Sequence, residues 1–488
     1  MGAEPHRLHI VLFPFPAHGH MIPILDIARL FAARNVEATI ITTHVNAPIF
    51  TKAVETGHKM GYPLINIKLF KFPTKEAGLP EGCENAEIVM KQPGLIPQFF
   101  EATQMLRGQL EEYLDRVRPD CLVADMFYPW ATDSATKFNV PRLVFHGISC
   151  FALCANEMIQ LYQPYRNVSS DDERFTIPRL PHEIKLVRSQ ISSELRAEKE
   201  NSSRNKKKLV TDTEVRSFGV IINSFYELEP SYAEFYTKEL GRKAWYIGPV
   251  SLCNRSIEKA RRGKQASIDE HECLTWLDSK TPASVVYLCF GSTSVSIDPQ
   301  LHEIAMALEC SGKNFIWAVR DGGNGKNKEW LPLGFEQRTK GRGLIIRGWA
   351  PQVLILEHQA VGAFVTHCGW NSTIEGISAG VPMVTWPFFA EQFYNEKLVT
   401  KILRIGVSVG VKKWSRTPTV DDLISQEAIE TAVREIMDGE KADEMRLRAK
   451  QLKKKAWKAV EEGGSSYTDL SALINDLRNY HAQKRVQS

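Results

Sequence analysis

The sequence predicts an α/β fold with two doubly wound parallel sheets. Apolar runs of strand length alternate with helical patterns over the first 45 residues, and the same alternation restarts near residue 284. The 488 residues suit three average domains or two large α/β domains, and the two successive series favour two. Hydrophobic residues make up 43% of the chain and charged residues 24%, which excludes disordered, collagen-like and disulfide-stapled classes.

The first elements of the chain are predicted to form a βαβ unit. His9–Phe13 is a short apolar run, apolar residues then recur at helical steps across Ile22–Phe31, and Ala38–Thr42 is a second apolar run. A strand, a helix and a strand in such close succession require a parallel sheet. Two further strands of this sheet are predicted at Cys121–Asp125 and Val140–Phe145.

A second series of elements begins at Ser284–Phe290, an apolar run that a glycine stops. A helical pattern follows across Pro299–Leu308, and Asn314–Val319 is the next predicted strand. The polar stretch Asn254–Asp269 separates the two series, so we expect it to be the interdomain linker. The expected divisions of the chain are a domain at 1–253, the linker at 254–269, a domain at 270–464 and a helix at 465–488.

Composition limits the partners and the compartment. Lys+Arg 61 against Asp+Glu 57 leaves a net charge of +4, too small to predict a nucleic acid or a membrane surface as a partner. Nine cysteines without a C-x-x-C pair favour a reducing compartment over disulfides or a zinc site. No apolar run approaches the roughly 18 residues that span a bilayer, and prolines interrupt the N-terminus where a signal peptide would be apolar. We expect a cytoplasmic monomer.

Two basic clusters are predicted to be solvated faces, with nucleic-acid binding as the alternative for either. Asn201–Lys208 is expected to be a surface loop, and Arg261–Lys264 a charged part of the linker.

The segment Trp349–Gln392 carries the strongest chemical signal. Ala360–Thr366 is predicted to be a strand, a turn follows at Gly369, and Ser372–Glu375 has the capping-box pattern that opens a helix. A helix N-terminus at the carboxyl end of a parallel strand offers free N–H groups and the positive end of the helix dipole. The pattern therefore predicts a diphosphate site. Side chains that add donors at this point are His367, Asn371 and Ser372.

Each of these residues taken singly also has a structural explanation. Glu375 and Ser372 suit a capping box, and Trp349 suits a core aromatic. Taken together, two tryptophans, a histidine, Asn-Ser and a terminal Glu-Gln on one α/β unit are difficult to explain as packing, because core positions are usually Val, Ile or Leu.

The same segment closely resembles the signature of plant secondary product glycosyltransferases in family 1 of the UDP-sugar-dependent glycosyltransferases. The segment spans the signature's full length of 44 positions without a gap. Pro16–His20 and Val123–Phe127 are also similar to the family, so that the resemblance covers essentially the whole chain. It implies a GT-B fold, in which two Rossmann-like domains face each other across a cleft. The acceptor would bind mainly in the N-terminal domain and the UDP-sugar in the C-terminal one, with 465–488 packing back onto the N-terminal domain.

By motif position, the resemblance assigns the donor site residue by residue. Trp349 would stack on the uracil and the Ala350 backbone would bond its edge. The remaining assignments are Gln352 and Glu375 to the ribose, His367, Asn371, Ser372 and Ser292 to the diphosphate, and Trp370, Glu391 and Gln392 to the sugar. An acid followed by Gln at the end of the motif goes with a glucose donor in the family. Glu391 stands where many members have Asp, which keeps the carboxylate but adds one methylene.

His20 and Asp125 are the candidate catalytic pair. His20 follows the first strand, and Asp125 ends a parallel strand at the carboxyl edge where such folds place ligands. An Asp bonded to one imidazole nitrogen fixes the tautomer, so that the other nitrogen can take a proton. The residues alone leave His18 and His20 as alternatives. The family places its base at the histidine after the glycine, which selects His20 and leaves His18 as an expected loop residue.

We therefore expect an inverting, UDP-glucose-dependent O-glucosyltransferase. The resemblance implies no metal or other cofactor, a small apolar hydroxylated acceptor, and transfer to a hydroxyl or carboxyl of a plant metabolite such as a flavonoid or a triterpenoid or steroidal aglycone. The alternatives are another donor (UDP-galactose or UDP-glucuronic acid), a UDP-sugar epimerase or hydrolase on the same fold, and a nucleotide-sugar-binding protein without catalysis. The presence of both His20 and Asp125 argues against the last.

Aromatic residues near the ends of the N-terminal strands are candidates for the wall of an acceptor pocket. An ordinary aromatic core is the alternative for each of them. They are Phe13, Phe15, Phe127, Tyr128, Trp130, Phe145, His146 and Phe151.

Overall fold

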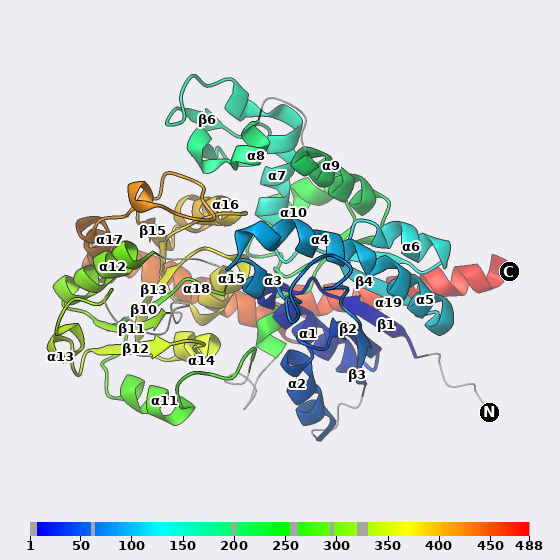
Figure 1. Cartoon of the computed structure of the whole chain (residues 1–488), viewed down its shortest axis with the longest axis horizontal. Coiled ribbons are helices and arrows are strands. Elements are labelled where there is room, and N and C mark those ends of the chain that lie inside the picture. The colour runs from blue at the N-terminus through cyan, green and yellow to red at the C-terminus, as the bar shows by residue number, and fades with distance from the viewer. Residues whose placement is uncertain are drawn as a thin grey trace.

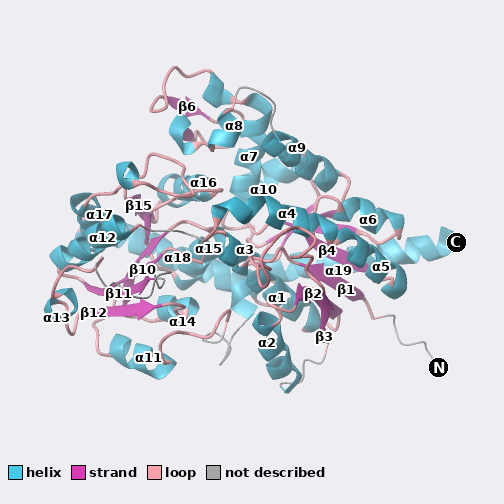
Figure 2. Ribbon diagram, viewed as in Figure 1, coloured by secondary structure: helices cyan, strands magenta, loops and turns pink. Residues whose placement is uncertain are grey.

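The computed structural model describes residues 7–59, 64–197, 202–253, 262–292, 297–319 and 330–487. They form two parallel sheets with helices on both faces, one on the right and one on the left of Figure 1. Figure 2 shows the strands of each sheet lying inside a layer of helices. Strands covered on both faces are mostly apolar along their length, which is why short apolar runs marked several of them in the sequence.

The first sheet has seven parallel strands in the order β3-β2-β1-β4-β5-β8-β9. The strand order reverses at β1, which pairs with β2 on one side and β4 on the other, so the edge between β1 and β4 is a switch point. The strands are β1 (His9–Phe13), β2 (Glu37–Thr43), β3 (Ile65–Phe70), β4 (Cys121–Asp125), β5 (Arg142–Phe145), β8 (Gly219–Ile222) and β9 (Ala244–Tyr246).

The second sheet has six parallel strands in the order β12-β11-β10-β13-β14-β15. Its switch point lies at β10, which pairs with β11 and β13. The strands are β10 (Val285–Cys289), β11 (Asn314–Val319), β12 (Gly343–Arg347), β13 (Val361–Thr366), β14 (Met383–Thr385) and β15 (Gly406–Ser408). Both sheets confirm the predicted doubly wound α/β class, and each predicted strand is found within two residues of its bounds at either end.

Helices and one small antiparallel hairpin complete the fold. The hairpin, β6 (Arg174–Thr176) with β7 (Lys185–Val187), projects beside α8 at the top of Figure 1. The helices of the first half are α1 (His18–Ala32), α2 (Pro48–Lys59), α3 (Ala86–Val89), α4 (Ile96–Met105), α5 (Arg107–Val117), α6 (Ala131–Lys137), α7 (Cys150–Tyr162), α8 (Ser193–Arg196), α9 (Ser202–Val215) and α10 (Pro230–Glu234). Those of the second half are α11 (Glu270–Asp278), α12 (Asp298–Ser311), α13 (Phe335–Arg338), α14 (Gln352–Glu357), α15 (Trp370–Ala379), α16 (Gln392–Lys397), α17 (Gln426–Asp438), α18 (Ala442–Val460) and α19 (Ser465–Gln487).

The last helix, α19, packs against the first sheet. Asp469 accepts a hydrogen bond from the Tyr246 backbone N–H at 2.8 Å. Leu473 and Leu477 are fully buried in one hydrophobic cluster with Ile10 of β1. The chain therefore returns, after the second sheet, to the core of the first (Figure 1).

Two polar segments differ from their predictions. The expected surface loop Asn201–Lys208 is wrong from Ser202 on, because Ser202–Val215 forms α9. Lysine is a good helix former, and a helix that is polar all round has no apolar period by which to recognise it. Of the expected linker, residues 254–261 lie outside the described residues. The described part, Arg262–Asp269, ends at the residue that caps the N-terminus of α11.

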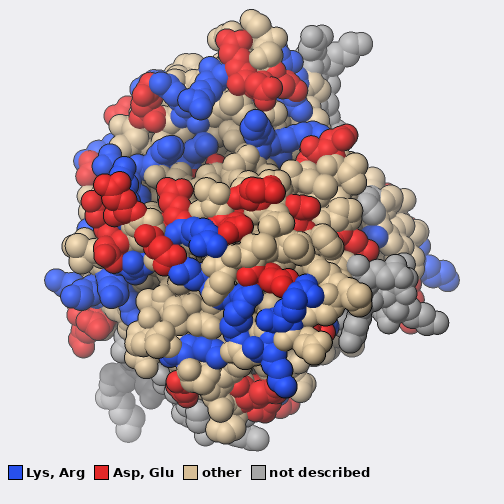
Figure 3. Space-filling view, turned by 90° about the vertical axis from the view of Figure 1, so that its left-hand side faces the viewer, with Lys and Arg blue, Asp and Glu red and all other residues tan. Residues whose placement is uncertain are grey.

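The surface carries charges of both signs. Figure 3 shows Lys and Arg interspersed with Asp and Glu over the described part of the face on the side of the second sheet. That face therefore offers no broad basic surface to a nucleic acid. Within the described ranges, no helix is both long and apolar enough to cross a membrane.

Candidate active site between the two sheets

His20 and Asp125 meet at the switch point of the first sheet. His20 lies in the first turn of α1, and Asp125 is the last residue of β4. The His20 Nδ1 atom lies 2.7 Å from Asp125 Oδ2, and Oδ1 of the same carboxylate accepts from the Phe127 backbone N–H at 3.1 Å. Asp125 is fully buried, whereas the His20 side chain keeps 20% of its surface exposed. A fixed carboxylate thus holds an imidazole that can still reach a ligand.

The charges around His20 favour its protonated form. Burial alone would lower the pKa of His20, but the Asp125 carboxylate, and after it Glu391 and Glu87, outweigh burial and raise this pKa above its usual value. Burial also raises the pKa of Glu391, the half-buried carboxyl that faces His20 from the second domain. Carboxyl groups of both domains therefore tune the same imidazole.

Three of the eight candidate acceptor aromatics surround His20. The ring centroids of Phe127, Phe15 and Phe145 lie 5.5, 5.8 and 6.4 Å from that of His20. They form an apolar wall around the imidazole; Phe15 and Phe145 are buried, so of the three only the half-buried Phe127 can also contact an acceptor.

The other candidate aromatics belong to the core. Phe13 stacks on Tyr128 at 4.2 Å beneath this wall, and both rings are almost completely buried. His146 is buried, with its Nε2 2.6 Å from Glu214 Oε2. Trp130 and Phe151 are likewise buried in aromatic clusters.

His18 is not the expected loop residue. It is the first residue of α1, it is only 3% exposed, and its Nδ1 lies 2.7 Å from Glu87 Oε2. Glu87 Oε1 accepts from the His18 backbone N–H at 2.8 Å and from Ser292 Oγ at 3.0 Å, which joins the two domains. Sequence reasoning missed Glu87, because its partners are distant in the chain.

His367 lies at the switch point of the second sheet, directly after β13. A Cβ atom at Gly291 would lie 2.5 Å from the imidazole, and one at Gly369 would lie 2.3 Å from it. Since real Cβ atoms do not approach so closely, only glycine leaves room for this ring between the two turns. The Phe290-Gly291 turn and the start of α15 are thereby held on either side of His367.

The predicted capping box at α15 is wrong. The N-cap is Gly369 without a side-chain cap bond, because a larger residue there would displace His367. Ser372 Oγ and Glu375 Oε2 instead both accept from Gln352 Nε2, at 3.1 and 2.7 Å. These side chains form one polar cluster between α14 and α15.

Asn371, in the first turn of α15, crosses to the other domain. Its Nδ2 donates to the Gly19 carbonyl at 2.6 Å, next to His20. Its Oδ1 is buried and finds no hydrogen-bond partner within the described part of the chain. The start of α15 and the start of α1 therefore face each other.

The three residues expected at the sugar differ in their hydrogen-bond partners and in their burial. Trp370 Nε1 donates to the Asn223 carbonyl at 2.7 Å. Gln392 Oε1 accepts from the Phe388 and Phe389 backbone N–H groups at 2.8 and 3.1 Å. Glu391 remains half-buried beside them, with Asn395 Nδ2 at 3.5 Å.

Trp349 and Ala350 are the two residues expected at the uracil. Trp349 is half-buried and Ala350 is buried, just before α14. Arg262, which was expected to be solvated, is instead almost buried between Asp26 of α1 and Glu375 of α15. Nothing in its basic cluster distinguishes Arg262 from its neighbours, since both carboxylates come from distant segments.

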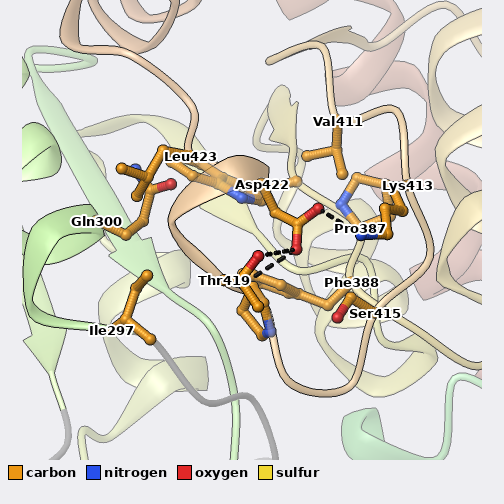
Figure 4. A pocket seen from close by; sticks show the side chains of 12 residues that line it. Ile297, Gln300, Pro387, Phe388, Val411, Lys413, Ser415, Thr419, Asp422 and Leu423 are labelled. Atoms are coloured by element: carbon orange, nitrogen blue, oxygen red, sulfur yellow. Dashed lines mark hydrogen bonds and ion pairs between the residues drawn. The ribbon is translucent and has the colours of Figure 1, made fainter.

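A cavity in the second domain contains none of the predicted site residues. Figure 4 shows it lined by Phe388, Leu423 and the ion pair between Lys413 Nζ and Asp422 at 3.1 Å.

No group of three or more His, Cys, Asp or Glu is arranged to hold a metal ion among the described side chains.

Two family models together match nearly the whole chain. The model "Glycosyltransferase, N-terminal domain" matches residues 6–252, and "UDP-glucoronosyl and UDP-glucosyl transferase" matches residues 242–455.

Individual proteins are similar over almost their full length. Scopoletin glucosyltransferase of Nicotiana tabacum is 56% identical over 97% of this chain and 98% of its own. UDP-glucose flavonoid 3-O-glucosyltransferase 7 of Fragaria ananassa is 53% identical over 97% and 96%. The crystal structure of Glycyrrhiza uralensis UGT73P12 complexed with glycyrrhetinic acid 3-O-monoglucuronide superposes with a TM-score of 0.92, at 42% identity over 99% and 98%. The chain thus belongs to the plant family 1 UDP-glycosyltransferases, GT-B enzymes whose co-substrate is a UDP-sugar.

Proposed function

We propose that this enzyme transfers glucose from UDP-glucose, with inversion, to a hydroxyl group of a flat phenolic metabolite of the coumarin or flavonoid type. The observation that carries the proposal is the buried Asp125 carboxylate at 2.7 Å from a partly exposed His20, inside an aromatic wall. The relatives named for scopoletin and for a flavonoid support glucose and a phenolic acceptor. The relative complexed with a triterpenoid glucuronide makes triterpenoids the second acceptor class to test.

The dyad supplies the base of the reaction. His20 Nδ1–H donates to Asp125, so that Nε2 is unprotonated and can take the proton of the acceptor hydroxyl. The acceptor oxygen attacks the anomeric carbon from the side opposite UDP while the bond between that carbon and the phosphate oxygen breaks. An α-linked sugar therefore becomes a β-glucoside, and UDP leaves with the electron pair of the broken bond.

The donor roles proposed here are those that the family signature assigns by motif position. We assign the uracil to Trp349 and the Ala350 backbone, and the ribose to Gln352 and Glu375. The N–H groups at the start of α15 stabilise the negative charge on the leaving UDP. The further assignments are His367, Asn371, Ser372 and Ser292 to the diphosphate, and Trp370, Glu391 and Gln392 to the sugar.

The proposal extends to domains, assembly and compartment. One chain holds the dyad and all donor residues, so we propose an active monomer with an acceptor domain at 1–253 and a donor domain at 270–464. All nine cysteines are free thiols, which supports a reducing compartment, and we propose the cytoplasm.

A transfer assay tests the proposal. The purified enzyme is given UDP-glucose, UDP-galactose or UDP-glucuronic acid with separate pools of coumarins, flavonoids and triterpenoid sapogenins, and UDP release and product mass are recorded. We expect a hexose adduct from UDP-glucose in a phenolic pool. UDP release without an adduct would indicate a hydrolase, interconversion of the sugar nucleotides would indicate an epimerase, and adducts in the sapogenin pool alone would refute the acceptor class.

A further inference from the structure

Two residues of the linker, Gly263 and Ser267, contact Trp349. A Cβ atom at Gly263, whose φ is +91°, would lie 2.4 Å from Trp349 Cζ2, so the linker backbone contacts the indole where only glycine fits. Ser267 fastens the segment on the same residue: its N–H donates to the Trp349 carbonyl at 2.8 Å, and its Oγ accepts from the Trp349 N–H at 2.9 Å.

Arg262 extends this contact to the neighbouring carboxylate. Its Nε donates to Asp26 Oδ2 at 2.8 Å, and its Nη1 donates to Glu375 Oε1. The guanidinium thus bridges α1 of the first domain and α15 of the second, with only 9% of its side chain exposed. Charge-assisted bonds of this kind are the stronger ones in proteins.

Trp349 and Glu375 are the two side chains assigned above to the uracil and the ribose. We propose that Arg262 and Gly263 form a strap that occupies the nucleoside half of the donor site, and that a UDP-sugar displaces it. The inference rests on the proposed donor site. When the donor binds, its ribose hydroxyls replace Arg262 at the Glu375 carboxylate, and its uracil replaces Gly263 at the Trp349 indole.

Such a strap lowers the apparent affinity for the donor. Only the fraction of molecules with the strap withdrawn can bind, so the measured dissociation constant exceeds the intrinsic one by the inverse of that fraction. A charge-assisted hydrogen bond lost on binding corresponds to about a tenfold change in affinity.

The test is the dissociation constant of UDP, measured by titration calorimetry. Arg262→Ala should bind UDP about tenfold more tightly than the wild type. Neither carboxylate loses all its partners in this variant, because Asp26 keeps Arg29 at 3.4 Å and Glu375 keeps Gln352. The matched control is Lys264→Ala, which removes the same charge from an exposed position in the same linker and should leave the affinity unchanged.

The sign of the change decides the proposal. Weaker UDP binding by Arg262→Ala would make Arg262 a ligand of the nucleotide and overturn the strap, and so would a result equal to that of Lys264→Ala. A wild type that fails to bind UDP at all would instead refute the proposed donor site itself.

Two further measurements do not depend on the alanine variant folding. Arg262→Lys, whose single ammonium cannot span both carboxylates, should also bind UDP more tightly, and equal or weaker binding would count against the strap. In the wild type, hydrogen exchange of the Ser267 amide should become faster when UDP is bound. Unchanged or slower exchange would contradict displacement.

Discussion

Asp125→Asn is the substitution that tests the dyad most sharply, because it changes one atom at the site and little else. Asp125 Oδ1 accepts from the Phe127 N–H, so the amide oxygen of Asn is expected to keep that place and turn its NH₂ group towards His20. The NH₂ group can only donate to Nδ1. The imidazole must then carry its proton on Nε2, where it cannot accept the proton of the acceptor hydroxyl.

The expected loss is about 10⁴-fold in kcat, the size of the loss when the histidine of a Ser-His-Asp triad is held in the wrong tautomer; it corresponds to about 5.4 kcal/mol of barrier. The pH profile changes as well. In the wild type the pKa of His20 is raised above 6.5, so the neutral base is lost, and the rate falls, as the pH drops through this raised value. Without the carboxylate, burial lowers the pKa of His20, and the acidic limb should move to lower pH.

Initial rates with saturating UDP-glucose and acceptor across the pH range measure both effects, with UDP affinity determined in parallel. Asp133→Asn is the control, since Asp133 is exposed on α6 and pairs with Arg216 at the surface. A variant that retains a tenth or more of the wild-type kcat, or one that loses UDP affinity together with activity, would refute the role given to Asp125.

Three other substitutions test the donor site and the fold. Trp349→Ala should raise the Kd of UDP about tenfold or more, because stacking on an aromatic ring contributes about 1–3 kcal/mol per base; an unchanged Kd by calorimetry would contradict the stacking role. Gly291→Ala and Gly312→Ala both place a side chain at positive φ, +71° and +69°, but only the first meets an imidazole, at 2.5 Å. Both should lose about 1–2 kcal/mol of stability, and only Gly291→Ala should weaken UDP binding; equal affinities would count against the phosphate site. Leu473 is fully buried in α19, so Leu473→Ala should lower the free energy of unfolding in urea by about 2–5 kcal/mol. Leu447 is 59% exposed, so Leu447→Ala should lower it by about 0.5 kcal/mol or less. Similar unfolding midpoints for the two variants would mean that α19 is not part of the core.

The sheets could be predicted from sequence because their strands are buried on both faces. Cys121–Asp125 is five buried residues, and β4 has these same bounds. A polar segment carries no such signal, which is why α9 was missed. The position of His20 after the first strand could be predicted, but its place in the first turn of α1 was not, and the choice between it and His18 required a resemblance.

Long-range contacts explain what could not be predicted at the site. Arg262 bonds to partners 236 and 113 positions away, and neither interval leaves a pattern in the sequence. The same holds for Glu87, which is 205 positions from Ser292. Glu375 was interpretable as a capping acid on local grounds, and only the packing of His367 against Gly369 excludes that role.

The measurement that tests the central claim most directly compares transfer and UDP binding in His20→Ala. If His20 is the base that takes the proton of the acceptor, the variant should lose glucosyl transfer while its Kd for UDP stays within about twofold of the wild type. Substantial residual transfer, or a collapse of UDP binding in parallel with activity, would contradict the account.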